Sequence, residues 1–403
     1  MWVYHQRQKE NKRGNTMKNF KLLLIAGLTA AMCLTGCGDK AEEAAVSSEI
    51  EEIVVEKEEI PVAEEVTEEP AEETADEELP PGEGYVRSSL TNLWVKEEVA
   101  NSRPIAVMMP TDSEAQPQFN IGNAGVLYEC MEEGSITRQM AIIEGWQDME
   151  KIGNIRSCRR YYIYMGMEWD AIIVHFGGVF YMEDLITRSD VDNISGAAEY
   201  GTGGSAPGSG SFFRNESKAA PHNAYNSGEN LTKAIESLGY EKEHRSQYWE
   251  PNHFTFTTAS APNTLEDYPD AKPATKVDLS DVFPVTKSYL EYNEEEGVYY
   301  KWLHNKEQID AATDEQLSFT NIIVQYTESA SLDGKGYKAF AMVDERGLDG
   351  LYITQGKAIP ITWKKTDDYA PTKYYDKNGK EIVLNTGKTY IAVAEQGTEA
   401  FIE

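Results

Sequence analysis

The sequence predicts an α+β protein of two domains, in which an N-terminal α/β layered domain is followed by a mainly β domain. About 320 residues follow a strongly acidic segment, which is more than one hydrophobic core usually holds. Residues 93–270 alternate short apolar runs with helical patterns, as α/β layers do. Residues 271–403 hold short runs rich in β-branched and aromatic residues and no long helical pattern, which predicts a mainly β domain.

The chain begins with a segment typical of export. Residues 1–16 are polar, and we expect them to be an upstream extension that carries no fold. Residues 17–36 read as a signal peptide, because two lysines precede an apolar run, 22–34, that is too short to span a bilayer. The run ends in Leu34-Thr35-Gly36-Cys37, which resembles the bacterial lipoprotein signal. That resemblance implies that Cys37 carries the lipid and that the protein works at the outer face of the cytoplasmic membrane, outside the cytoplasm.

An acidic tether is expected at residues 37–92. Residues 39–83 hold 19 Asp and Glu against two lysines, and such a segment buries too little apolar surface to order itself. The whole chain carries −31, residues 39–83 carry −17 and residues 1–38 carry +5, which leaves −19 for residues 84–403. Neutralising phosphates requires clustered Lys and Arg, so we exclude nucleic acid as a partner. The membrane is reached through the lipid anchor.

The N-terminal domain is expected to alternate strands with helices. Ser157 is a candidate N-cap of the first helix, and a strand, a Gly177-Gly178 turn and a helix follow one another as in α/β layers. A glycine-rich loop at 201–210 is expected to be mobile. The predicted strands are 103–109, 125–131, 137–143 and 171–175, and the predicted helices are 157–166, 179–188 and 227–239.

The C-terminal domain is expected to consist of strands joined by tight turns. Gln355-Gly356 and Asn378-Gly379 lie between such runs and have hairpin chemistry. The predicted runs are 277–292, 298–303, 321–326, 337–343, 350–354, 358–363, 373–375 and 389–393.

Several short motifs follow one another along both domains. They are Arg103-Pro-Ile-Ala-Val-Met, Gly134-Ser-Ile-Thr-Arg138, Gly153-Asn-Ile-Arg-Ser-Cys-Arg159, Val174-His-Phe-Gly-Gly178, Ala220-Pro-His-Asn223, Ala274-Thr-Lys276, Thr362-Trp-Lys-Lys365 and Gly387-Lys-Thr389. Taken together and in order, these motifs resemble the YerB-like lipoprotein family, domain of unknown function 3048. The resemblance spans roughly residues 93–393 and implies a two-part fold and an envelope location, with no established reaction. Cys158 stands where the family pattern has alanine, so we do not expect it to share chemistry with the family.

The most concentrated positive charge of the acidic chain is Arg156-Ser157-x-Arg159-Arg160. A helix that starts at Ser157 would place free N–H groups beside Arg156 and make an anion site. Guanidinium groups suit carboxylate or phosphate. Equally, these arginines could form internal salt bridges with acids of the same domain, namely Glu129, Glu132, Glu133 or Asp170.

Two histidines complete the candidate site. His175 ends a buried strand just before Gly177-Gly178, where open α/β sheets place ligand-binding residues, and His222-Asn223 follows the glycine-rich loop. Either histidine alone is more often a satisfied core or loop residue, whereas a pair that converged with the arginines would line a cleft. The expected ligand-binding residues are Arg156, Ser157, Arg159, His175, Gly177, Gly178, His222 and Asn223.

Other site chemistry finds little support. Metal-ligand spacings and nucleotide-binding or nucleophile-elbow motifs are absent from the sequence, so we expect no metal and no cofactor. Cys130 and Cys158 either form a disulfide or are two buried thiols.

The sequence therefore predicts a lipid-anchored protein that binds an anionic small molecule, a peptide or an envelope polymer. One alternative is an envelope hydrolase or transferase with His175 or His222 as general base; another is a scaffold for envelope proteins with no pocket. The seven Trp and 23 Tyr residues could line a sugar- or peptide-binding face, although aromatic residues in strands more often form core.

Overall fold

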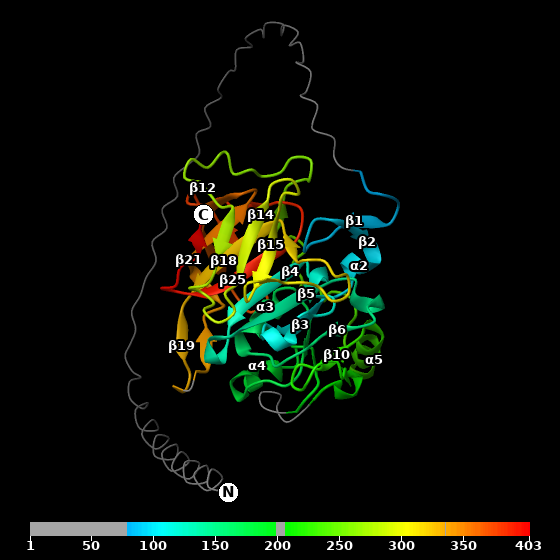
Figure 1. The fold of residues 1–403 in the computed structure, drawn as a ribbon. Helices are drawn as coiled ribbons and strands as arrows, with labels where there is room; N and C mark the ends of the chain where they lie inside the picture. Colours follow the sequence, from blue (N-terminus) through cyan, green and yellow to red (C-terminus); the bar gives the residue numbers. More distant parts are fainter. Residues whose placement is uncertain (1–78, 199–205, 335) are drawn as a thin grey trace, which may run out of the picture. The chain divides into compact units, whose positions relative to one another are not determined.

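One large mixed sheet runs through both halves of the chain (Figure 1). The computed structural model describes residues 79–198, 206–334 and 336–403. Within them, the strand order of this sheet is β12-β22-β21-β18-β25-β4-β5-β3-β7-β8, with β23 beside β22. Its strands are β3 (Ile105–Pro110), β4 (Val126–Met131), β5 (Thr137–Ile143), β7 (Ile172–His175), β8 (Asn193–Ser195), β12 (Lys272–Pro273), β18 (Asn321–Thr327), β21 (Asp344–Thr354), β22 (Lys357–Lys365), β23 (Lys373–Tyr375) and β25 (Thr389–Glu395).

The N-terminal and C-terminal parts meet in the middle of this sheet. Strand β25, close to the C-terminus, pairs in parallel with β4, from Thr389 opposite Val126 to Val393 opposite Cys130. All residues of β3, β4 and β5 are buried. Both faces of the sheet are therefore covered, which explains why these strands read as continuous apolar runs.

Helices cover the two faces of the N-terminal part. Tyr162 and Met165 of α3 (Arg160–Met167) and Leu185 of α4 (Glu183–Ile186) lie in one core cluster, whereas Leu231 and Ile235 of α5 (Gly228–Leu238) lie in the other. A short helix, α2 (Glu97–Asn101), follows β2. The 3₁₀ turns are η1 (Ser113–Ala115), η2 (Ile121–Asn123), η3 (Glu133–Ser135), η4 (Trp146–Asp148), η5 (Phe180–Met182) and η6 (Ser209–Ser211).

A second sheet of the C-terminal part packs into the same core cluster as α5, through Val277, Leu290 and Tyr299. Its order is β16-β15-β14-β13-β26, with β17 beside β15, and its strands are β13 (Lys276–Asp278), β14 (Tyr289–Asn293), β15 (Val298–Leu303), β16 (Lys306–Glu307), β17 (Ser318–Phe319) and β26 (Phe401–Ile402). Smaller sheets pair β1 (Tyr85–Arg87) with β2 (Trp94–Lys96), β10 (Ala224–Asn226) with β6 (Ile152–Gly153) and β9 (Phe213–Arg214), β11 (Thr255–Phe256) with β24 (Val383–Leu384), and β19 (Ser329–Ser331) with β20 (Lys338–Phe340).

The predicted α+β class is confirmed, and several predicted turns are present. Gln355 and Gly356 both have positive φ between β21 and β22, which fits a two-residue hairpin turn. Ser227 caps α5 by accepting a hydrogen bond from the Asn230 amide, and Gly239 ends the helix in the left-handed region. The domain boundary at residue 270 stays a prediction.

Other predictions need correction. Ser157 does not cap α3, which begins at Arg160 with Arg159 at the N-cap and no side-chain cap. The reason is that residues 156–158 bond to residues 176–178 and not to the first turn of the helix, since the Phe176 amide donates to Arg156 O and the Cys158 amide donates to Gly177 O. The expected helix 179–188 is a 3₁₀ turn followed by the one-turn α4.

Two expected segments differ in extent. The run 277–292 is divided, because β13 ends at Asp278 and β14 starts at Tyr289. Part of the expected tether, whose predicted end is residue 92, is folded, since β1 pairs with β2 and Leu90 is buried. The signal peptide, Cys37, most of the tether and residues 201–205 of the glycine-rich loop lie outside the described residues.

Two further observations concern the thiols and the membrane. Cys130 and Cys158 are free and buried, and burial raises the pKa of Cys158 to about 12. Among the described residues, none of the helices has the length and apolar character needed to cross a membrane.

Candidate functional site

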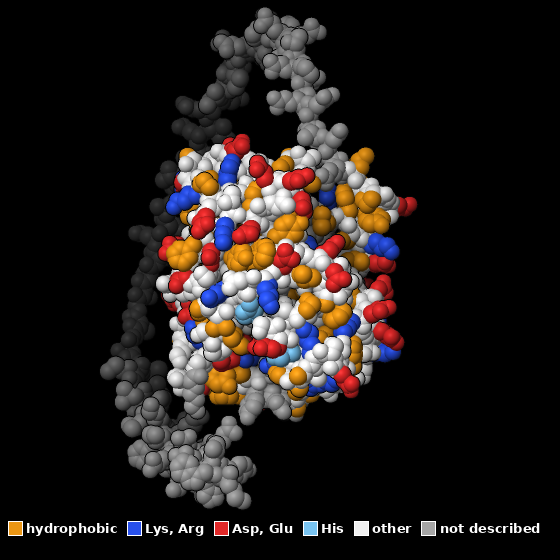
Figure 2. Space-filling model, in the orientation of Figure 1, with side chains coloured by type: hydrophobic (Ala, Val, Ile, Leu, Met, Phe, Trp, Pro, Cys, Tyr) orange, Lys and Arg blue, Asp and Glu red, His pale blue; other side chains and the backbone are white. Residues whose placement is uncertain are grey.

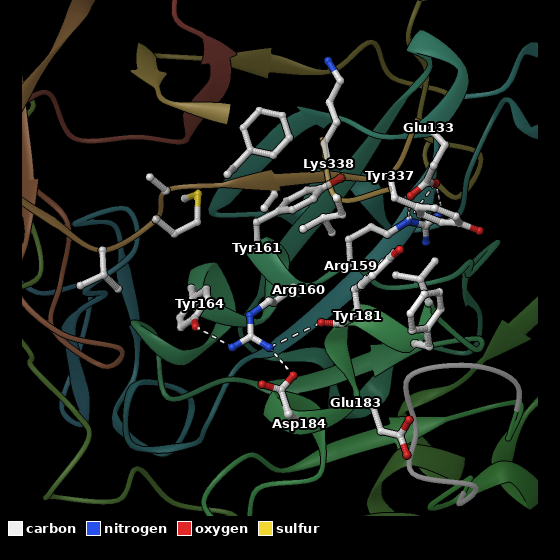
Figure 3. A pocket seen from close by; sticks show the side chains of 18 of the residues that line it. Glu133, Arg159, Arg160, Tyr161, Tyr164, Tyr181, Glu183, Asp184, Tyr337 and Lys338 are labelled. Carbon is white, nitrogen blue, oxygen red and sulfur yellow. Dashed lines mark hydrogen bonds and ion pairs between the residues drawn. The ribbon is translucent and has the colours of Figure 1, made fainter. Parts of the chain in front are cut away.

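An open groove of about 1000 Å³ lies on the N-terminal part beside β20. Helix α3, the turn η5 with α4, and the segment 337–343 that contains β20 line it (Figure 3). Its lining is rich in aromatic side chains, namely Tyr161, Tyr164, Phe180, Tyr181, Tyr337 and Phe340. A concave site with aromatic walls and a few polar groups is the usual form of a ligand site.

Three of these rings form a cluster at the surface. The Tyr181 ring lies 3.8 Å from that of Phe180 and 5.5 Å from that of Tyr337, measured between centroids. Phe180 is 50% exposed. Tyr181 and Tyr337 are partly exposed. A core phenylalanine would be covered, so a half-exposed ring beside two partly exposed ones is a candidate place for another molecule to pack. The rings reach the surface because Val179 is extended and η5 is only one turn long, so neither Phe180 nor Tyr181 is drawn into the core.

Most charges that line the groove pair with one another (Figure 3). Arg160 pairs with Asp184, and Arg159 pairs with Glu133. Lys338 pairs with Glu395, outside the groove. The side chain of Glu183, an exposed residue, has no ion-pair partner among the residues that the structure describes. The groove therefore presents one carboxylate that is free to meet a ligand cation.

Beside the groove, the arginine cluster predicted from the sequence is real, but most of it is internally paired. Glu132 pairs with two arginines, because Arg138 Nε donates to its Oε2 at 3.1 Å and Arg159 Nη2 lies 3.2 Å from the same oxygen. Burial acts to lower the pKa of Arg159, yet Glu132 and Glu133 outweigh it and raise that pKa. The predicted alternative of an internal salt bridge thus holds for Arg159. Arg138, which takes part in the same cluster, was not among the expected ligand-binding residues.

Arg156 behaves differently from its neighbours. No carboxylate of the described chain lies within ion-pair distance of it, and its Nη1 is 3.4 Å from His222 Nδ1. Burial, and then the positive charge of Arg138, lower the pKa of Arg156. Burial also lowers the pKa of His222, whose Nδ1 lies 4.0 Å from Asp112 Oδ2. An anion bound here would supply the ion-pair partner that the Arg156 guanidinium lacks within the described chain.

His175 is placed apart from this pair. It is fully buried, its Nδ1 lies 2.7 Å from Gly177 O and its Nε2 lies 3.3 Å from Asn193 Oδ1. Burial lowers the pKa of His175. None of its described contacts involves Arg156 or His222, so its contacts match those of a satisfied core histidine.

The remaining expected residues make internal contacts. Ser157 Oγ donates to Phe176 O at 3.2 Å. Gly177 O accepts from the Cys158 amide, and Gly178 bridges to Cys158. The side chain of Asn223 accepts from Arg214 Nη1 at 2.6 Å. Among the described residues, no group of three or more His, Cys, Asp and Glu side chains is arranged to hold a metal ion.

Sequence reasoning missed the aromatic wall of the groove. The available signal was two adjacent aromatic residues, Phe180 and Tyr181, shortly after the Gly177-Gly178 turn, together with Tyr337 directly after Gly336. Each lies in a short segment without periodicity, and their meeting depends on contacts between chain segments about 150 residues apart.

Known proteins match both parts of the chain. The N-terminal and C-terminal domains of the protein of unknown function DUF3048 match residues 90–241 and 279–391. A relative from Bacillus subtilis (strain 168), named "Putative lipoprotein YerB", is 28% identical over 309 residues, which are 76% of this chain and 86% of the relative.

A solved structure shares the fold. The crystal structure of the YerB protein from Bacillus subtilis superposes with a TM-score of 0.62 at 22% identity, over 77% of this chain and 96% of that one. The two domain matches, at residues 90–241 and 279–391, fall in the part of the chain that carries the motifs. The chain therefore belongs to the YerB-like DUF3048 family.

Proposed function

We propose that the protein is a lipid-anchored, extracytoplasmic binding protein that takes a ligand of the cell envelope in the aromatic groove. The observation that carries the proposal is the groove itself, about 1000 Å³ in volume and walled by six aromatic rings, of which Phe180 is half exposed. Aromatic faces contribute binding energy to sugars and peptides alike, because their large apolar area leaves water on contact. An envelope polymer, peptide or glycan, is the ligand class that matches an open groove.

The proposed location rests on the sequence and on the relative. Leu34-Thr35-Gly36-Cys37 supports lipidation at Cys37, and the Bacillus subtilis relative is named as a lipoprotein. Two acyl chains anchor a protein stably where one does not. A flexible coil of about 50 residues reaches roughly 40 Å, so the acidic segment would hold the groove away from the outer face of the cytoplasmic membrane.

An anionic group on the ligand is a second element of the proposal. Arg156 is not among the residues that line the groove, and it supports this element because its guanidinium has His222 as its described side-chain neighbour and no carboxylate. His222, whose Nδ1 lies 4.0 Å from Asp112 Oδ2, would then lie beside the bound anionic group. The enzyme alternative has less support at His175, because both of its ring nitrogens have partners within the chain, and His222 stays the other candidate base of that alternative. The scaffold alternative leaves the groove without a role.

The proposal is tested by titrating the purified chain with a defined panel, N-acetylglucosamine tetramer and short peptides with Lys, Glu or neutral side chains, followed by NMR. We expect at least one probe to shift the aromatic signals of Tyr181 and Tyr337. The double variant Tyr181→Ala/Tyr337→Ala should weaken that binding at least tenfold. Phe401→Ala is the matched control, because Phe401 is 46% exposed and lies outside the groove. Equal binding by the double variant, or no response to any probe, contradicts the proposal.

A further inference from the structure

Strand β20 has an open edge. Its residues pair with β19 on one side, Ser329 opposite Phe340, Ala330 opposite Ala339 and Ser331 opposite Lys338. In the described part of the chain no further strand joins this two-stranded sheet. An open edge is a template for another strand.

The hydrogen bonds of the hairpin fix which groups point outward. The Leu332 amide donates to Tyr337 O at 2.9 Å, and the Ala341 amide donates to Glu328 O at 3.0 Å. In an antiparallel pair, residues that bond to the partner alternate with residues whose N–H and C=O point away. Tyr337, Ala339 and Ala341 therefore face β19. The backbone groups of Lys338 and Phe340 point away from it.

The outward edge faces the aromatic groove. All of residues 337–343 line the groove, one after another. A strand that turned one face to a hollow would line it with every second residue. A continuous lining is expected where the edge itself borders the hollow. Across it, α3 reaches the same strand, since the rings of Tyr161 and Phe340 lie 4.8 Å apart.

The lysine on this edge does not protect it from another strand. Exposed edges are commonly protected by a lysine, and Lys338 occupies this position. Its ammonium pairs with Glu395 of β25, and Figure 3 shows its side chain running away from Arg160 and Asp184. The groove side of the edge is therefore free of a fixed positive charge from this residue.

The charges that line the groove favour a ligand with a positively charged side chain. Glu183 is the groove carboxylate without an ion-pair partner in the described chain, and Figure 3 shows it on α4 with its carboxylate directed away from the rings. A free carboxylate in a groove with aromatic walls suits a lysine or arginine side chain. The chain's own segment 39–83 carries −17 and would be repelled, so the occupant comes from another molecule.

We propose that an extended peptide segment of a partner protein, carrying Lys or Arg, adds as a strand to the edge of β20 formed by Lys338 and Phe340, with its cation at Glu183. This inference rests on the proposed function, because it takes the groove as the binding site. Main-chain hydrogen bonds give such complexes their affinity, and pockets for alternate side chains give them specificity.

The experiment uses a fluorescein-labelled octapeptide that alternates threonine and valine with lysine, and the same peptide N-methylated at every second amide. Lys338→Pro removes the outward N–H, whereas the matched control Lys338→Ala removes the side chain and keeps the N–H. We expect Lys338→Ala to bind within about threefold of the wild type, and Lys338→Pro and the N-methylated peptide to bind at least tenfold more weakly. Glu183→Gln should also weaken binding severalfold.

A measurement on the wild type guards against misfolding of the proline variant. Hydrogen exchange at the Phe340 amide should slow when the octapeptide is added. If both peptides bind equally, or the Phe340 amide is not protected, strand addition is wrong. If the glycan probe shifts Tyr181 and Tyr337 while the octapeptide does not bind, strand addition is wrong and the groove keeps its proposed function. If no probe shifts these rings, both proposals are wrong.

Discussion

Two polar regions of this molecule differ in whether their charged side chains are paired within the chain. At the junction of the two halves, Glu129 of β4 and Lys301 of β15 are both fully buried, with 3.1 Å between Glu129 Oε2 and the lysine Nζ. Hydrogen bonds occupy the other positions of the carboxylate. Its further donors are Thr137, Gln139, Ser288 and Tyr390.

The groove and its surroundings leave charges without such partners. Glu183 is exposed and Arg156 is partly buried, and neither has an ion pair in the described chain. Water solvates a group at an open surface, so it need not be paired internally, whereas an unpaired charge in the core is costly. The difference indicates that the junction serves stability and that the groove is available for recognition.

The largest expected effect comes from breaking the junction. Burial acts to raise the pKa of Glu129, but Lys301 and the hydrogen-bond donors outweigh it and hold that pKa below its ordinary value. Glu129→Gln leaves a buried ammonium without its counter-ion and should lower the free energy of unfolding by about 3–5 kcal/mol. Urea denaturation measures this. The control is Lys276→Ala, which removes a partly exposed pair with Glu291 and should change stability by less than about 1 kcal/mol. Equal effects of the two variants would contradict the assignment.

Two arginines of the cluster, one paired and one unpaired, are expected to differ clearly in their contribution to stability. Arg138 is 1% exposed and paired with Glu132, so Arg138→Ala should cost about 3 kcal/mol. Arg156→Ala removes no ion pair and should cost less than about 1 kcal/mol, while it weakens any anionic ligand. Thermal denaturation of both variants tests the contrast. A loss for Arg156→Ala as large as that for Arg138→Ala means that Arg156 is structural.

A smaller effect concerns pH. His253 is buried and stacks on Trp169 with ring centroids 3.6 Å apart, and burial lowers its pKa to about 3. The unfolded chain takes up this proton near pH 6.5, so the stability due to neutral His253 is complete above that pH. It is lost progressively as the pH falls from 6.5 towards 3. His253→Phe should reduce the slope of unfolding free energy between pH 6.5 and pH 4 by up to about 1.4 kcal/mol per pH unit. Identical slopes would show that the histidine is not buried in its neutral form.

The smallest expected effect is on stability at the groove. Phe180 is half exposed, so Phe180→Ala should change the free energy of unfolding by no more than about 0.5 kcal/mol. Phe254, 7% exposed in the core, is the matched control and should cost about 3–5 kcal/mol when changed to alanine. Calorimetry of the two variants separates a recognition surface from a packing surface. A large loss for Phe180→Ala would assign that ring to the core.

Much of the fold could be predicted because its signals are local. The apolar runs at 103–109 and 137–143 became β3 and β5, and the Ser227 cap and the Gln355-Gly356 turn lie where the residues indicated. The pairing of β25 with β4 could not be predicted, since it joins segments more than 250 residues apart and no local pattern encodes it. The prediction that the helix starts at Ser157 was wrong for a related reason, because residues 156–158 bond to residues 176–178, about 20 residues further along the chain.

The site was only partly predictable. The sequence located the arginines and left open whether they were paired, and the structure pairs Arg159 but leaves Arg156 beside His222. Which arginine meets which acid depends on side-chain geometry that spacing alone does not determine. The groove depends on Tyr337 reaching Tyr181 across the fold.

Hydrogen exchange followed by mass spectrometry tests the division between the two regions most directly. The purified full chain is compared with and without the lysine-containing octapeptide. The account predicts slower exchange in residues 337–343 and in the facing segments of α3 and η5, with β4 and β25 unchanged. Protection of β4 and β25 without any change at 337–343 would contradict the assignment of the groove as the recognition region.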